Sequence, residues 1–220
     1  DALVIQAHGL GATAETYLPQ TMWFVDHGYC VLTYDATGTG ASEGKTTRGL
    51  SQSAIDLDAA LNYVAQDTVL AGLPVLLFGH SWGGYGAAAV LKDHPEVSAC
   101  ASLSAYDTPF KLMCEQAERY CGPVCYLFAP FVLLHERVLF GAAANRSASE
   151  AVRDSGVPVL VVHGDADKTV RADGAALIAR TLSQNAQTLL LEGETHMSLL
   201  RPHTREYADY TDKINADYSA

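Results

Sequence analysis

Six short apolar runs alternate with longer segments of helical spacing, and this alternation limits the folds that the chain can adopt. The apolar runs cover residues 2–7, 29–34, 73–78, 97–103, 157–162 and 187–192. Short runs that are apolar throughout are typical of strands buried on both faces of a parallel sheet. The pattern therefore predicts an α/β domain with a doubly wound, mostly parallel sheet of about six strands.

The segments between these runs predict the helices that would cover the sheet. Helical spacing occurs at about 14–27, 48–66, 82–93, 171–183 and 203–217. In the second segment, apolar residues return at steps of three or four and mark one buried face: Leu50, Ala54, Leu57, Leu61 and Val64. A chain of 220 residues with 49% hydrophobic content can form one sizeable core, so we expect a single domain over residues 1–220.

Residues 105–150 lie between two predicted strands and are far longer than an ordinary crossover. They contain the apolar stretch PVCYLFAPFVLL and then the small, polar stretch GAAANRSASE. We expect this insertion to form a helical lid over a pocket, with extra packing helices as the alternative. As a lid, it would line the pocket with apolar and aromatic side chains, among them Tyr126, Phe128 and Phe131.

Charge and hydropathy exclude some classes of partner. The chain has 14 basic and 25 acidic residues, and a net charge of −11 disfavours nucleic acid. No run of 18 uncharged apolar residues occurs, because charged residues and Pro130 interrupt the best candidate at 123–140, so no membrane span is predicted. The chain opens directly on the strand-like ALVIQAHG without a signal peptide, which favours a cytoplasmic location.

The five cysteines do not indicate a metal centre. Cys30 and Cys100 lie in apolar runs and are predicted to be buried. Cys114, Cys121 and Cys125 cluster in the insertion without a fourth ligand at a recognisable zinc spacing. Structural or free thiols are favoured, with a disulfide or a metal site as alternatives. We predict no metal or other cofactor.

The most specific motif is GHSWGG, residues 79–84, which stands between an apolar run and a helical segment. It fits the pattern G-x-S-x-G of a serine held on a sharp strand-to-helix turn. Gly79 and Gly83 would leave room where side chains would collide, and Ser81 would project its hydroxyl above the strand ends. The helix N-terminus that follows favours a developing negative charge. The alternative is a glycine-rich turn with an incidental serine.

A serine nucleophile needs a histidine base and a carboxylate that orients the base. His196 follows the last apolar run in EGETHMSLL, and Asp165 and Asp167 follow the preceding run in VVHGDADKTV. Loops that follow parallel strands meet at one edge of the sheet, so these side chains could meet Ser81. His163 is a rival for His196 as the base.

In the order Ser, Asp, His, the chain resembles the α/β-hydrolases. The resemblance spans residues 2 to about 210 and implies Ser81 as the nucleophile, Asp167 rather than Asp165 as the acid, and His196 as the base. It makes His163 structural. The first two strands of the family pattern are absent, and the implied strand order is 4-3-5-6-7-8 in the family's strand numbering.

Two glycine-rich stretches extend this resemblance. AHGLGAT, residues 7–13, is similar to the family's oxyanion loop, which implies the backbone N–H groups of Leu10 and Trp82 as oxyanion donors. YDATGTGASEG, residues 34–44, is similar to a loop that is mostly structural in the family. It lacks the Lys-Ser/Thr ending of a phosphate-binding loop.

These residues imply acyl transfer to water. The chain resembles small bacterial serine esterases, including those that cleave cinnamoyl esters, and the apolar insertion suits an apolar or aromatic acyl group. We therefore expect a serine esterase that forms an acyl-enzyme, with a small-molecule ester as its partner. The alternative is a serine aminopeptidase or amidase, in which Glu115, Glu118 or Glu136 would hold the substrate amine. A binding module without catalysis is disfavoured because Ser81, Asp167 and His196 are all present.

Overall fold

A computed structural model describes residues 2–180, 183–201 and 205–218. It contains one sheet, whose strands are β1 (Leu3–Ala7), β2 (Cys30–Thr33), β3 (Val75–His80), β4 (Val97–Leu103), β5 (Val159–Gly164) and β6 (Ala186–Leu191). The helices are α1 (Leu18–Asp26), α2 (Gln52–Gln66), α3 (Trp82–Ala89), α4 (Pro109–Cys121), α5 (Ala129–Phe140), α6 (Ala148–Ser155) and α7 (Arg205–Tyr218). Short 3-10 turns supplement them, including η1 (Ala14–Tyr17), η2 (Gly122–Phe128), η3 (Gly141–Ala143), η4 (Leu177–Ala179) and η5 (Ser198–Leu200).

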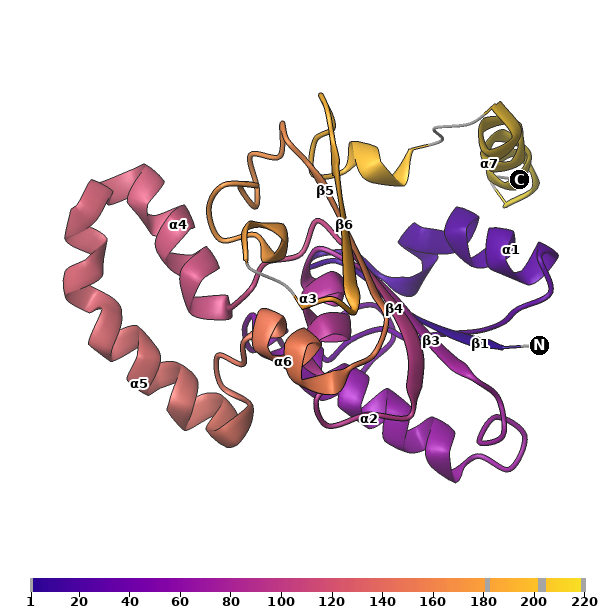
Figure 1. Cartoon of the computed structure of the whole chain (residues 1–220), viewed down its shortest axis with the longest axis horizontal. Helices are drawn as coiled ribbons and strands as arrows, with labels where there is room; N and C mark the ends of the chain where they lie inside the picture. Colours follow the sequence, from indigo (N-terminus) through magenta and orange to yellow (C-terminus); the bar gives the residue numbers. More distant parts are fainter. Residues whose placement is uncertain (1, 181–182, 202–204, 219–220) are drawn as a thin grey trace.

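The six strands lie in the order β2-β1-β3-β4-β5-β6, and every neighbouring pair is parallel. This order confirms the predicted sheet. Helices α1 and α7 lie on one face of it, and α2, α3 and α6 lie on the other (Figure 1). The carboxyl ends of β1, β3, β5 and β6 therefore point to one edge, which gathers the loops that follow them.

The predicted buried face of α2 is confirmed, because Ala54, Leu57, Leu61 and Val64 are all buried in the core. The helix begins at Gln52 and not near residue 48 as predicted. Arg48 and Gly49 have φ values of 59° and 150°, which are incompatible with a right-handed helix. Leu50 therefore precedes the helix, although it packs against the core.

The helix predicted at 171–183 is wrong for the described part of that range, which is irregular except for η4. Its backbone N–H groups are instead hydrogen-bonded to residues from other segments of the chain. The Glu115 carboxylate accepts from the N–H groups of Arg171 and Ala175, and Leu177 N–H donates to the carbonyl of Ala105. These partners replace the hydrogen bonds that a helix would have formed within itself.

The 105–150 insertion folds into α4, η2, α5, η3 and α6. Helices α4 and α5 extend away from the sheet as an arc (Figure 1). Each ends at a glycine with a positive φ value, Gly122 at 60° and Gly141 at 55°, a conformation that glycine adopts at little cost. The apolar side chains of α5 face outward for the most part, since only Glu136 and Phe140 of this helix are buried.

One described segment, Pro109–Ser155, meets the length and composition criteria of a membrane-spanning helix, with a hydropathy of 1.4 over its best window. These criteria allow two charged residues, whereas the sequence-based prediction considered runs of 18 uncharged apolar residues, so the absence of a membrane span stays a prediction. The structure nevertheless divides this stretch at Gly122 and Gly141, so that α4 has 13 residues and α5 has 12. A helix needs about 20 residues to cross a bilayer.

All five cysteines are free thiols in the structure. Cys100 is buried as predicted, whereas the predicted burial of Cys30 is wrong. Cys30 opens β2, which pairs only with β1 among the described strands and therefore lies at an edge of the sheet. An edge strand has less covering structure than a central strand, which explains the exposure of Cys30.

Candidate active site

Ser81 stands on the sharp turn between β3 and α3. Its φ and ψ angles are 55° and −114°, a strained conformation for a residue with a side chain. Its N–H donates to the carbonyl oxygen of Leu103 at 2.7 Å, which ties the turn to β4. A Cβ atom at Gly79 would lie 2.3 Å from the carbonyl oxygen of Gly83, and one at Gly83 would lie 2.1 Å from that of Ala7. The predicted need for both glycines is confirmed.

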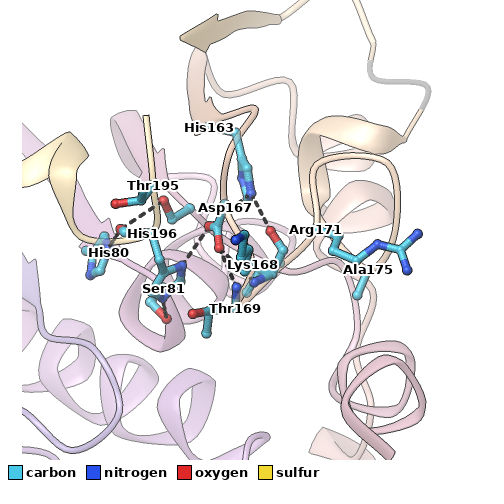
Figure 2. A network of polar contacts seen from close by, with 12 residues as sticks. His80, Ser81, His163, Asp167, Lys168, Thr169, Arg171, Ala175, Thr195 and His196 are labelled. Atoms are coloured by element: carbon cyan, nitrogen blue, oxygen red, sulfur yellow. Dashed lines mark hydrogen bonds and ion pairs between the residues drawn. The ribbon is translucent and has the colours of Figure 1, made fainter. Parts of the chain in front are cut away.

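Three side chains from three loops form a continuous hydrogen-bonded chain (Figure 2). The Nε2 atom of His196 lies 2.8 Å from the Oγ atom of Ser81, and its Nδ1 atom lies 2.7 Å from Oδ2 of Asp167. Ser81 follows β3, Asp167 follows β5 and His196 follows β6. The structure thus brings the three predicted residues together at the carboxyl edge of the sheet.

The environment of Asp167 favours its charged form. Burial raises the pKa of this carboxyl, but hydrogen bonds from His163, His196 and the N–H of Val170 outweigh burial and hold the pKa well below its usual range. The Oδ1 atom also accepts from the N–H of Thr169 at 2.8 Å. A carboxylate only accepts, so Nδ1 of His196 carries a proton and Nε2 is free to accept the proton of Ser81.

The two rivals named from the sequence lie elsewhere. The Oδ1 atom of Asp165 accepts from the N–H of Gly193 at 2.7 Å, and no hydrogen bond with His196 is recorded for it. His163 is fully buried, and its Nε2–H donates to the carbonyl oxygen of Val170 at 2.9 Å and lies 3.3 Å from Asp167. His163 therefore supports the loop of Asp167, Asp165 joins that loop to the loop of His196, and neither is hydrogen-bonded to Ser81.

A cavity of about 430 Å³ opens on Ser81 and His196. None of its described lining residues carries a formal charge at neutral pH apart from the titratable histidines. Most of its wall comes from the loop after β1, the elbow and the loops after β4, β5 and β6, and Leu50 before α2 and Leu112 on α4 complete it. Besides Ser81 and His196, the described lining residues are Gly9, Leu10, Gly11, Ala12, Thr16, Tyr17, Leu50, His80, Trp82, Tyr106, Leu112, Thr169, Val170 and Met197.

Leu10 and Trp82, the predicted oxyanion donors, both line this cavity. Trp82 is the first residue of α3, where backbone N–H groups have no partner within the helix. Leu10 lies in the loop after β1, and among the described residues no acceptor is recorded for its N–H. Both residues thus lie on the wall of the cavity that contains Ser81.

The predicted pocket residues Tyr126, Phe128 and Phe131 do not line this cavity. Phe128 and Phe131 are 60% and 69% exposed, and Tyr126 lines a separate depression beside Glu118 and Arg171. The physical reason is the direction of the insertion, whose far end extends away from the strand ends (Figure 1). From the insertion, only Tyr106 near its start and Leu112 on α4 join the described cavity wall.

Sequence reasoning missed several wall residues, including Tyr17, Leu50, Leu112 and Met197. Met197 could have been predicted to line the site, because it directly follows His196 in the sequence. The other three resemble ordinary core residues in the sequence, and only the tertiary fold separates them. Among the described residues, no group of three or more His, Cys, Asp and Glu side chains could hold a metal ion.

Comparison with known proteins places this site in a family. Residues 1–130 match the family described as serine aminopeptidase, S33. Among curated proteins, a putative carbamate hydrolase of Variovorax paradoxus is 28% identical over 159 residues. That match covers 67% of this chain and only 56% of the relative, so the chain spans little more than half of that protein.

Solved structures with the same fold include an esterase of Pyrococcus furiosus, with a TM-score of 0.70 at 17% identity over 100% of this chain and 83% of the other. Est1E of Butyrivibrio proteoclasticus, solved with ferulic acid bound, has a TM-score of 0.64 at 18% identity, and the match covers 100% and 90% of the two chains. Identities this low establish the fold alone. With the family match over more than half of the sequence, they lead to one conclusion: the chain belongs to the serine aminopeptidase (S33) family and has the α/β-hydrolase fold.

Proposed function

We propose that the protein is a serine hydrolase that cleaves uncharged carboxylic esters with an apolar or aromatic acyl group. One observation carries the proposal: the hydrogen-bonded chain Asp167–His196–Ser81 ends on a cavity with no carboxylate, lysine or arginine in its described lining. A charged substrate group would lose its hydration there without gaining an ionic partner.

The reaction follows from the directions of the hydrogen bonds. Ser81 Oγ attacks the ester carbonyl carbon while its proton passes to Nε2 of His196, and Asp167 stabilises the imidazolium that forms. The N–H groups of Leu10 and Trp82 hold the oxyanion. As the bond to the alcohol breaks, Nε2–H protonates the leaving oxygen and an acyl-enzyme remains. Water, deprotonated by His196, then attacks the acyl carbon and releases the acid and Ser81.

The family and the neighbouring structures support a hydrolase, and two of the neighbours favour an ester. One of them is an esterase, and another binds ferulic acid, an aromatic acid. Both neighbours support an ester of an apolar or aromatic acid as the substrate class. The aromatic and aliphatic wall contributed by Tyr106, Leu112 and Trp82 suits an acyl group of this kind.

The family's description also raises an aminopeptidase as a second candidate. Such an enzyme needs an acidic group close to the substrate amine. Glu115 accepts from two backbone N–H groups and Glu136 accepts from the hydroxyl of Ser51, while Glu118 lies beside a separate depression. None of the three lines the cavity at Ser81, so this second candidate has less support.

The test is turnover of short, long and cinnamoyl p-nitrophenyl esters beside aminoacyl p-nitroanilides. Wild type is compared with Ser81→Ala and with Ser98→Ala, which removes an exposed hydroxyl from β4. We expect ester turnover that is lost by several powers of ten in Ser81→Ala and kept in Ser98→Ala. Turnover of the anilides instead would favour the peptidase, and ester turnover that survives in Ser81→Ala would contradict the proposal.

A further inference from the structure

A buried tyrosine and histidine pair adjoins the candidate triad on the cavity wall and has no part in the mechanism above. The hydroxyl oxygen of Tyr17 lies 2.8 Å from Nδ1 of His80, and each side chain is only 1% exposed. Tyr17 ends η1, and His80 ends β3 directly before Ser81. The contact therefore joins the segment that follows the Leu10 loop to the strand that carries the nucleophile.

Chemistry fixes the direction of every hydrogen bond in this group. The Nε2 atom of His80 lies 2.8 Å from the carbonyl oxygen of His196, and a carbonyl can only accept (Figure 2). Nε2 of His80 therefore carries the proton, and its Nδ1 accepts from the hydroxyl of Tyr17. The oxygen of Tyr17 in turn accepts from the N–H of Gly9 at 2.9 Å. One chain of donors thus runs from Gly9 through Tyr17 and His80 to His196.

The protonation states of Tyr17 and His80 are consistent with these hydrogen-bond directions. Burial lowers the pKa of His80 from 6.5 to about 4 and raises that of Tyr17 from 10.0 to about 12. Both side chains are therefore neutral around pH 7, and the donors and acceptors keep the roles just derived.

Both ends of this series of hydrogen bonds adjoin groups that the proposed reaction uses. Gly9 precedes Leu10, whose N–H is one of the two proposed oxyanion donors. At the other end, the carbonyl held by His80 belongs to His196 itself, and the hydroxyl of Ser104 lies 3.4 Å from the same oxygen. A shift of about 1 Å in a reacting group can cost about 100-fold in rate, so fixing these two backbone positions has a direct kinetic consequence.

We infer that Tyr17 and His80 are positioning residues, which hold the loop of Leu10 and the backbone of His196 at fixed positions relative to Ser81. The inference rests on the proposed function, because it concerns the same nucleophile and base. Neither side chain exchanges a proton with substrate. His80 contributes an N–H at its Nε2 position, and Tyr17 contributes both a donor and an acceptor.

Two variants of His80 separate positioning from packing. The amide nitrogen of glutamine can occupy the position of Nε2, and that of asparagine can occupy the position of Nδ1. His80→Gln therefore keeps a donor for the carbonyl of His196, whereas His80→Asn loses it. Tyr17→Phe removes the hydroxyl between Gly9 and His80 and tests the positioning role independently of the His80 variants.

The measurement is the rate of Ser81 labelling by a fluorophosphonate, with the labelled peptide identified by mass spectrometry, beside kcat and KM for the best ester and the melting temperature. We expect His80→Gln to stay within about threefold of wild type, and His80→Asn and Tyr17→Phe to label about 10- to 100-fold more slowly. The loss should appear in kcat, with KM changed less than about threefold.

The outcomes distinguish this inference from the proposed function. If wild type is not labelled at Ser81, or if Ser81→Ala keeps ester turnover, the proposed function fails, and the inference fails with it. The inference is overturned if Ser81 is labelled but the two His80 variants react at the same rate, or if the labelling rates simply follow the melting temperatures. Tyr17 and His80 would then contribute packing alone. If neither His80 variant folds, Tyr17→Phe decides: an unchanged labelling rate would overturn the inference.

Discussion

The Nε2 atom of His196 lies 2.8 Å from the Oγ atom of Ser81, although 115 residues separate them in the chain. The contact forms because β3 and β6 are parallel, so the loops after both strands lie at one edge of the sheet. The same edge receives Asp167 from the loop after β5. A hydrogen-bonded chain across three loops requires each loop to keep its place relative to the other two.

The choice of acid can be tested with matched amide substitutions. Asp167→Asn removes the charge that faces Nδ1 of His196, and we expect kcat for esters to fall about 10⁴-fold, as loss of a triad carboxylate does in serine proteases. Asp165→Asn changes only an acceptor for the N–H of Gly193 and should keep most of the activity. Equal losses in both variants would show that the loop, and not the Asp167 charge, matters.

The glycines of the elbow make a prediction about stability. A Cβ atom at Gly83 would lie 2.1 Å from the backbone carbonyl of Ala7, which cannot move without disturbing β1. We expect Gly83→Ala to lower the free energy of unfolding by at least about 2 kcal/mol. Gly72→Ala is the control, because a Cβ atom there would meet nothing within 4 Å. Urea denaturation measures both, and a Gly83→Ala protein as stable as the control would contradict the structure.

Burial of His80 makes stability depend on pH. Its pKa falls from 6.5 to about 4 on folding, so the unfolded chain binds more protons between these pH values. The free energy of unfolding therefore decreases as pH falls from 6.5 to 4, by about 3 kcal/mol for this group. Above pH 6.5 the contribution is fully present.

Urea titrations of wild type and His80→Gln between pH 4 and 7 isolate this contribution, because the variant lacks the titrating ring. The difference in stability between the two proteins should shrink by about 3 kcal/mol toward pH 4. A difference that stays constant over this range would mean that His80 is protonated or exposed in the folded protein.

The wall of the cavity predicts which part of the insertion affects specificity. Leu112 on α4 lines the cavity, whereas Phe131 on α5 is exposed. We expect Leu112→Ala to lower kcat/KM for cinnamoyl and long-chain esters about 10-fold, and for acetate esters much less, because bulky acyl groups lose an apolar contact. Phe131→Ala should leave the profile unchanged. The opposite result would mean that α5 closes over substrate, as the sequence led us to expect.

The sequence predicted the central features of the site. Ser81 is identifiable because a strained turn leaves room only for glycine at Gly79 and Gly83, a constraint visible in six consecutive residues. The sheet was predictable for a similar reason, since strands buried on both faces must be apolar throughout. His196, Asp165 and Asp167 became candidates because each follows a strand whose carboxyl end had to meet that of β3, whereas the preference for Asp167 and His196 came from the resemblance to the α/β-hydrolases.

Only the tertiary structure decided the remainder. The helix expected at 171–183 is absent from the described residues of that range because Glu115, more than 50 positions earlier, takes two of its N–H groups. The expected pocket residues Tyr126, Phe128 and Phe131 lie off the cavity because the insertion turns outward, a direction that apolar composition does not encode. The series of hydrogen bonds from Gly9 through Tyr17 and His80 to His196 likewise depends on distances between separate loops. Local sequence determines the conformation of a turn or a strand, whereas contacts between distant segments exist only once the chain has packed.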